Sequence, residues 1–216
     1  MGIHTILFDL DGTLIDTNEL IIESFKHTFD TFNIPYTLEE LSTYNGPPLV
    51  DTFKKVNPNF VEEMLKTYRE HNLSHHEQYV RLFPNVLETV KRLHGKNYKL
   101  AIVTTKLRDS ALVGIEITGL KPYFETIITL DDVACAKPHP EPVYKALEAL
   151  NSEPSQAIMV GDNYHDIIAG QRAGTLTAGV AWSRHGSDYF VQYEPTYMLN
   201  DMLDLLKIIK SLSEGE

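Results

Sequence analysis

Two carboxylates early in the chain have the spacing of a cation-binding or proton-transferring site. Asp9 and Asp11 follow the apolar run at 5–8, and Gly12 comes directly after them. Two carboxylates at the end of a buried strand are unfavourable unless a cation or a proton lies between them. Gly12 permits a sharp turn there. The pair could instead be an acidic loop that caps the next element, but this pattern favours a functional site.

A second acidic pair follows a later apolar run, at 157–160. Asp162 and Asp166 stand four residues apart at the expected start of a helix. They could bind the same cation as the first pair. The alternative is helix capping, which Asp162 or Asn163 could provide without any metal.

Two further polar residues complete the set. Thr104 ends the apolar run at 99–103, and its hydroxyl could donate a hydrogen bond to a phosphoryl oxygen, although threonine is also a common strand residue. Lys137 lies beside three prolines within 138–142, which predict a rigid loop that holds the lysine in place. Taken alone, such a lysine is more often a solvated surface charge.

The elements that position these residues alternate between strands and helices. Short, mostly β-branched apolar runs predict buried parallel strands at 5–8, 99–103, 126–129, 157–160 and 177–181. Between them, one helix is expected from Pro84 to Gly95 and another is expected to begin near Pro142. This alternation predicts an α/β fold with a doubly wound, mainly parallel sheet.

One long segment interrupts the alternation with helical signals only. Asp16 with Glu19, and Thr37 with Glu40, have capping-box spacing, and apolar residues follow at helical intervals. We therefore expect an inserted helical cap domain at 17–81, and an α/β core made of 1–16 and 82–216.

Composition limits the classes of function. The 216 residues include 19 Lys and Arg against 30 Asp and Glu, a net charge of −11, which argues against nucleic-acid binding. No apolar run is long enough to span a membrane, and the N-terminus has no signal-peptide pattern. The single cysteine, Cys135, cannot form an internal disulfide, so we expect a cytoplasmic protein. It has no convincing base beside it in the sequence, so we expect an inert thiol. No obligate protein partner is evident, and the adjacent His75 and His76 are expected to be structural or solvated.

Together the four motifs resemble those of the haloacid dehalogenase-like superfamily: an Asp-x-Asp pair, a Thr or Ser, a Lys and a Gly-Asp-x-x-x-Asp. The resemblance covers nearly the whole chain and is greatest to the phosphoglycolate phosphatase branch. Within that branch the chain is most similar to the inorganic pyrophosphatases linked to dephosphorylation of the phosphocarrier HPr, through segments such as 14–22, 46–49, 102–108, 159–166 and 177–182. Arg172 and Leu176 are less typical, but neither lies in a catalytic motif.

This resemblance implies a role for each motif residue. Asp9 is expected to attack phosphorus and form an aspartyl-phosphate, and Asp11 to protonate the leaving group and then activate water. Thr104 and Lys137 are expected to hold the transferring oxygens. Mg²⁺ is the expected cofactor, with Asp9, the Asp11 carbonyl and Asp162 as ligands and Asp166 orienting them.

Substrate identity is the least determined expectation. The cap segment 17–81 has six basic and ten acidic residues, so a small anion is favoured over a large polyanion. Gly46 of the cap loop, Thr105, Lys106 and Arg108 are the expected substrate-binding residues. Pyrophosphate is the predicted substrate; the alternatives are phosphoglycolate or another small phosphomonoester and, in a different reaction, a sugar phosphomutase. A dehalogenase is less favoured, and a catalytically silent binding protein would be expected to lack a motif acid. The cap is expected to close over the substrate by hinge motion.

Overall fold

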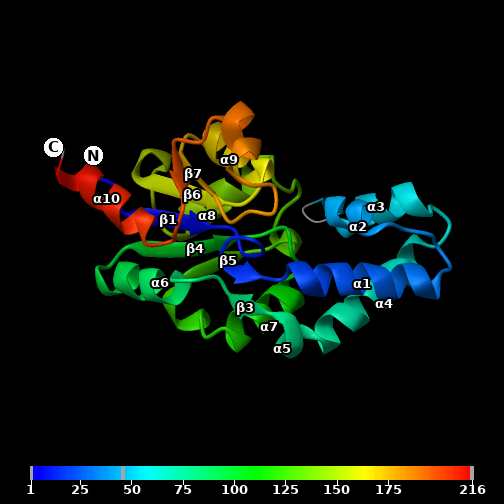
Figure 1. The fold of residues 1–216 in the computed structure, drawn as a ribbon. Helices are drawn as coiled ribbons and strands as arrows, with labels where there is room; N and C mark the ends of the chain where they lie inside the picture. Colours follow the sequence, from blue (N-terminus) through cyan, green and yellow to red (C-terminus); the bar gives the residue numbers. More distant parts are fainter. Residues whose placement is uncertain (1, 45–46, 215–216) are drawn as a thin grey trace. The chain divides into compact units, whose positions relative to one another are not determined.

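The chain forms two compact units (Figure 1). The computed structural model describes residues 2–44 and 47–214. Residues 1–15 and 82–216 form the first unit, which we call the core, and residues 16–81 form the second, which we call the helical unit. Two short strands, β2 (Ile15–Asp16) and β3 (Arg81–Leu82), pair where the chain passes from one unit to the other. Among the described residues, no helix has the length and apolarity to cross a bilayer.

The core is built on one six-stranded sheet, and all of its strand pairs are parallel. The strand order is β5-β4-β1-β6-β7-β8. The strands are β1 (Thr5–Phe8), β4 (Lys99–Val103), β5 (Thr126–Ile128), β6 (Ala157–Gly161), β7 (Leu176–Val180) and β8 (Tyr197–Leu199). The predicted fold class is confirmed, although the edge strand β8 was not anticipated. Its three residues are too few to show a periodic pattern.

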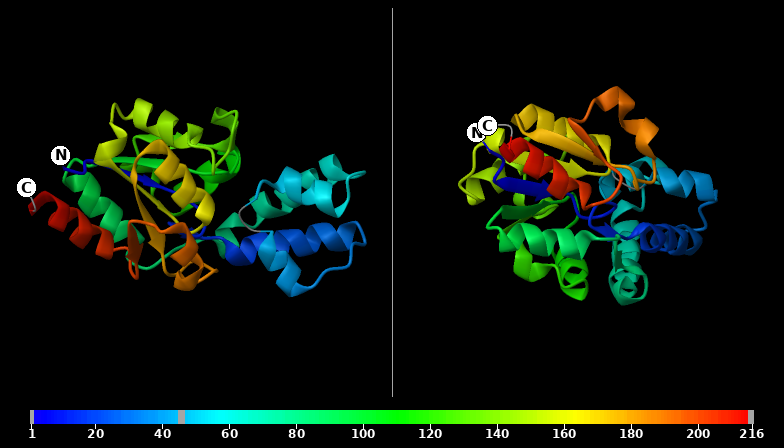
Figure 2. Two further views of the ribbon diagram at one scale, coloured as in Figure 1. Left: turned by 90° about the horizontal axis from the view of Figure 1, so that it is seen from above. Right: turned by 60° about the vertical axis from the view of Figure 1, so that its left-hand side comes forward.

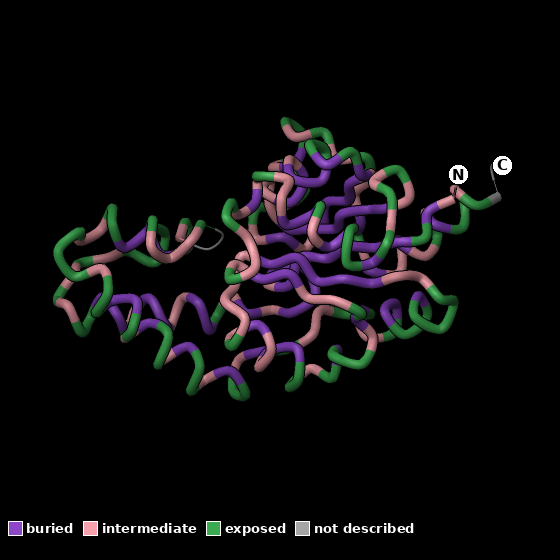
Figure 3. The backbone as a smooth tube through the Cα atoms, turned by 180° about the vertical axis from the view of Figure 1, so that it is seen from behind, coloured by how far each residue is buried: buried purple, intermediate pink, exposed green. Residues whose placement is uncertain are grey.

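Helices cover both faces of this sheet (Figure 2). The helices α8 (Glu141–Ala149) and α9 (Tyr164–Ala173) pack on one face, and α6 (Val86–Gly95), α7 (Arg108–Ile117) and α10 (Asp204–Glu214) lie on the other. The strands run through the buried centre of the core (Figure 3). With both faces covered, the central strands can be apolar without interruption, as their sequences suggested. Short 3₁₀ turns lie at Lys121–Tyr123, Leu130–Asp132, Pro154–Gln156 and Ser187–Tyr193.

The helical unit has a separate hydrophobic core. Its helices are α1 (Asn18–Thr31), α2 (Leu38–Thr43), α3 (Leu49–Val56), α4 (Val61–Ser74) and α5 (His76–Tyr79). Phe25 is fully buried and contacts the rings of Phe29, Phe53 and Tyr68. The predicted Thr37–Glu40 capping box is present, with both of its hydrogen bonds.

Two predicted helix starts are wrong. Thr17, not Asp16, is the N-cap of α1, because Asp16 Oδ1 accepts the backbone N–H of Asn18, only two residues on. Helix α6 begins at Val86 rather than at Pro84, because Asn85 has a left-handed backbone conformation with φ of 59°. That conformation interrupts any helix that begins earlier.

Candidate active site

The sheet brings the predicted motifs together because its three central strands end at the same edge. Strand β1 lies between β4 and β6, and Phe8 pairs in register with Ile102 and with Val160. Asp9, Thr104 and Asp162 each follow directly from one of these strand ends. In open α/β sheets, ligands bind beyond this edge.

Lys137 is the centre of the site. Its Nζ donates to Oδ1 of Asp9 at 2.7 Å, to Oδ1 of Asp166 at 2.6 Å and to the carbonyl of Val103 at 2.7 Å. An ammonium group has three protons, so these acceptors satisfy all of them. The lysine side chain is 2% exposed, and the alternative of a solvated surface charge is therefore excluded.

Asp166 links the lysine to helix α9. Its Oδ1 accepts from Lys137, and its Oδ2 accepts the backbone N–H of Asn163 at 3.1 Å. Asn163 in turn is the N-cap of α9, and its side chain accepts from the His165 N–H. Helix capping by Asn163 therefore coexists with the acidic cluster. Gly161 is required here, because a Cβ on it would lie 2.2 Å from the Asp166 Cβ.

The electrostatics of the site call for additional positive charge. Burial raises the pKa of the Asp9 carboxyl to about 7, and the neighbouring Asp166 and Asp11 add to this rise, while Lys137 opposes it. Burial together with Asp9 and Asp166 also raises the pKa of Asp162 well above its usual value. For Lys137, burial lowers the pKa, but Asp166 and Asp9 outweigh burial and raise it. The carboxylates are thus only partly neutralised by the lysine.

The residues present fit a hard divalent cation. Carboxylate oxygens of Asp9, Asp162 and Asp166 lie within 4.8 Å of one another. Oxygen donors of this kind are those that Mg²⁺ prefers. Gly12 has φ of 83°, and a Cβ there would lie 2.2 Å from Oδ2 of Asp162, so only glycine leaves room for this carboxylate. The cluster could hold a metal ion.

Asp11, the second carboxylate of the pair that follows β1, forms an ion pair with a lysine other than Lys137. Lys106 Nζ donates to Oδ1 of Asp11 at 3.0 Å, and both side chains are largely buried. The Thr104 hydroxyl accepts the backbone N–H of Lys106 at 3.1 Å, so Thr104 fixes the turn that carries this lysine. A hydroxyl that accepts one bond still has its proton to donate.

The remaining predicted substrate-binding residues differ in position. The Arg108 guanidinium pairs with Asp132 at 2.5 Å, and its backbone N–H donates to Asp131. Thr105 is half-buried beside Thr104. Gly46 lies outside the described residues.

Sequence reasoning missed one supporting residue, Ser183. Its hydroxyl donates to the backbone carbonyl of Asp162 at 2.7 Å and fixes the chain at this acid. The only sequence signal was a serine three residues beyond the end of β7.

Fold and site together combine a parallel α/β sheet with a cluster of carboxylates and one buried lysine at the ends of its central strands. The sequence profile of the haloacid dehalogenase-like hydrolases matches residues 6–180. The chain belongs to this family.

Relatives and solved structures agree with this assignment. The chain is 49% identical to the pyrophosphatase PpaX of Oceanobacillus iheyensis, over 97% of this chain and 98% of the relative. It is 52% identical to the pyrophosphatase PpaX of Anoxybacillus flavithermus, over 97% and 98%. Among solved structures, a haloacid dehalogenase-like family hydrolase from Streptococcus pneumoniae is similar, with a TM-score of 0.85, 26% identity and coverage of 95% and 98%.

Proposed function

We propose that the protein is a Mg²⁺-dependent hydrolase of inorganic pyrophosphate that works through an aspartyl-phosphate. The observation that carries the substrate assignment is the near-50% identity to pyrophosphatases over almost the full length of both chains. The site geometry supports the reaction class independently, because it combines a buried reactive carboxylate with a fixed lysine.

The carboxylates of Asp9 and Asp162, with the backbone carbonyl of Asp11, would hold the magnesium ion. When bound, the ion supplies positive charge that reduces repulsion between an anionic nucleophile and an anionic phosphoryl group. Asp166 would orient the ligands of the ion without contacting the ion itself, because its two oxygens already accept hydrogen bonds from Lys137 and Asn163.

Asp9 is the proposed nucleophile. One of its carboxylate oxygens attacks phosphorus, and the bond from phosphorus to the bridging oxygen breaks, leaving an aspartyl-phosphate and free phosphate. Lys137 holds Asp9 Oδ1 at 2.7 Å and so orients the carboxylate for attack. The Thr104 hydroxyl is proposed to contact an oxygen of the transferring group, and Lys137 is proposed to do so by exchanging one of its three present acceptors for a phosphoryl oxygen.

Asp11 is the proposed acid and base. It donates a proton to the departing phosphate and then accepts one from the water that hydrolyses the aspartyl-phosphate. Lys106, 3.0 Å from Asp11, is proposed to bind the second phosphate as that group leaves. Arg108 contributes through its bond to Asp132, which anchors the start of α7.

Phosphoglycolate is the alternative substrate, because its carboxylate could occupy the position of the second phosphate. A phosphomutase would use the same motifs but would pass the phosphoryl group to a sugar. Closure of the helical unit as a cap, and a cytoplasmic location, stay predictions.

A kinetic panel tests the proposal. Pyrophosphate, phosphoglycolate, sugar phosphates and an aryl phosphate are compared in Mg²⁺, with Asp9→Asn as the inactive control. We expect the highest kcat/KM for pyrophosphate and release of phosphate without any sugar acceptor. A preference for phosphoglycolate would refute the pyrophosphatase assignment. Near-full activity of Asp9→Asn would refute the assignment of Asp9 as the nucleophile.

A further inference from the structure

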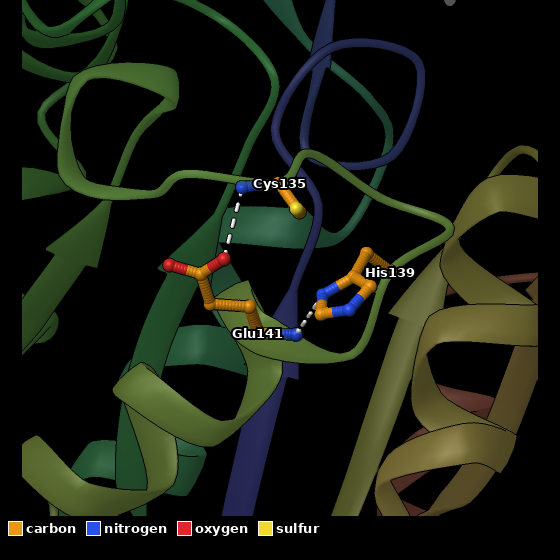
Figure 4. A group of neighbouring side chains, drawn as sticks. All are labelled: Cys135, His139 and Glu141. Atoms are coloured by element: carbon orange, nitrogen blue, oxygen red, sulfur yellow. Dashed lines mark hydrogen bonds between the residues drawn. The ribbon is translucent and has the colours of Figure 1, made fainter.

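The loop that leads into helix α8 carries a second group of potential metal ligands. Sγ of Cys135, a ring nitrogen of His139 and a carboxylate oxygen of Glu141 lie within 4.8 Å of one another (Figure 4). The cysteine and the histidine are exposed, and the glutamate is half-buried. Cys135 was expected to be inert because no convincing base stands beside it in the sequence, and the structure brings His139 and Glu141 close to it.

Hydrogen bonds already hold this loop in shape. The Glu141 carboxylate accepts the backbone N–H groups of Ala134 and Cys135, each at 2.9 Å. The backbone N–H of Glu141 donates to Nδ1 of His139 at 3.2 Å. Because these bonds order the ligand-bearing segment beforehand, a cation bound there would cost little additional chain entropy.

The ligand types select the kind of cation. A thiolate, an imidazole and one carboxylate are a donor set for Zn²⁺ or a similar thiophilic ion, whereas Mg²⁺ prefers oxygen donors alone. We propose that Cys135, His139 and Glu141 form a second metal site, chemically distinct from the carboxylate site, that binds Zn²⁺ with water in the fourth position. Nδ1 of His139 accepts the Glu141 N–H with its single lone pair, so it is deprotonated, and a cation bound at Nδ1 would replace that hydrogen bond.

Binding at this site involves proton release but no redox step. The Cys135 thiol loses its proton to solvent, and its sulfur binds the cation as a thiolate. The ammonium of Lys145, 3.1 Å from Oε1 of Glu141, is the positive charge with which the metal competes. Lys137 stands between Cys135 and His139 in the chain, so a bound ion would join the two sides of the loop that carries the active-site lysine.

Cobalt spectroscopy on the full chain tests the proposal. Co²⁺ is titrated in the presence of saturating Mg²⁺, which occupies the carboxylate site, and Zn²⁺ is then added. We expect a thiolate-to-Co²⁺ charge-transfer band that saturates at one equivalent and disappears as Zn²⁺ displaces the probe. Cys135→Ser should abolish the band and weaken Zn²⁺ binding by at least about 100-fold, the upper end of the effect of losing a supporting partner. His139→Gln should also weaken it.

His4→Gln is the matched control, since His4 is an exposed histidine outside the cluster and should bind Zn²⁺ as the parent does. All of these substitutions are at exposed positions, so folding is expected to be retained. Zn²⁺ binding that Cys135→Ser leaves unchanged would overturn the proposal. The helical unit has a second group of histidines, the stacked rings of His27, His71 and His75. Loss of Zn²⁺ binding in His71→Gln, which interrupts this stack, would also overturn the proposal. A stoichiometry of one Zn²⁺ ion per two protein chains would also overturn the proposal.

Discussion

The ammonium of Lys137 lies 2.7 Å from Oδ1 of Asp9, although 128 residues separate the two in the chain. The same ammonium binds Asp166, so one buried cation balances two buried carboxylates. Removing one member of a buried ion pair leaves an uncompensated charge, which is far more costly than losing a surface pair.

Lys137→Met should therefore destabilise the fold as well as abolish activity. We expect a loss of about 3–5 kcal/mol in the free energy of unfolding and at least a 100-fold loss of kcat/KM. Urea denaturation measures the free energy of unfolding, and steady-state kinetics measure kcat/KM. Lys207→Met is the control, because Lys207 pairs with Asp204 at the surface, and it should change neither quantity appreciably. A stable Lys137→Met variant would contradict the charge-balancing role.

The raised pKa of Asp9 predicts how stability depends on pH without metal. Because burial raises this pKa to about 7, the folded protein holds a proton that the unfolded chain releases near pH 4. Stability therefore falls as pH rises from about 4 towards 7. At the proposed Mg²⁺ site, binding of the ion would release that proton, so the rise in Tm caused by Mg²⁺ should be larger at pH 8 than at pH 5.5. Asp9→Asn should reduce the pH dependence of the metal-free protein, and an equal Mg²⁺ effect at both pH values would contradict the prediction.

The Arg108–Asp132 pair predicts the opposite pH dependence. Burial favours a higher pKa for the Asp132 carboxyl, but hydrogen bonds from Arg108 and Thr129 outweigh it and lower the pKa to about 2. Stability from this carboxylate is complete above about pH 4 and is lost as the pH falls towards 2. Because both side chains are partly exposed, Asp132→Asn should cost only about 1 kcal/mol at pH 7, and the difference should shrink in acid. Denaturant titrations at pH 7 and pH 3 measure it.

Lys106 and Arg108 can be separated by their effects on substrate specificity. A charge-assisted hydrogen bond contributes about 1.5–3 kcal/mol, or about 10- to 150-fold in rate. Lys106→Gln should lower kcat/KM for pyrophosphate by this factor but change hydrolysis of an aryl phosphate much less, since the aryl ester has no second phosphate. Arg108→Gln should mainly lower stability. An equal loss with both substrates in Lys106→Gln would contradict its proposed contact with the second phosphate.

Substitution of Gly12 tests the space beside Asp162, a proposed metal ligand. An alanine at φ of 83° is strained by about 1–2 kcal/mol, and its Cβ would also displace Asp162. Gly119→Ala is the matched control, because Gly119 has φ of 70° with nothing within 4 Å of the added Cβ. Both variants should lose stability through backbone strain, Gly12→Ala more because of its contact with Asp162, but only Gly12→Ala should lose Mg²⁺ affinity, measured by calorimetry. Equal Mg²⁺ affinity in the two variants would show that Gly12 serves only the turn.

The sequence by itself determined the strands of the core other than β8 and the residues at their ends. Uninterrupted apolar runs form strands that are covered on both faces, and Asp9, Thr104 and Asp162 follow such runs directly. Since parallel strands end at a common edge, their proximity could be expected before the structure was known. The N-cap at Thr17 and the start of α6 at Val86 could not be predicted from the sequence. They depend on one hydrogen bond and one backbone angle that many sequences allow.

Only the tertiary structure decided which charges pair. The sequence does not distinguish the partners of three cations near the site. In the structure, Lys137 binds Asp9, Lys106 binds Asp11 and Arg108 binds Asp132. The convergence of Cys135, His139 and Glu141 is equally a product of how their loop turns. Local periodicity reports burial of a segment against its neighbours, whereas side-chain pairing depends on the angles at which loops leave the sheet. Those angles are set by packing between elements that are distant in the chain.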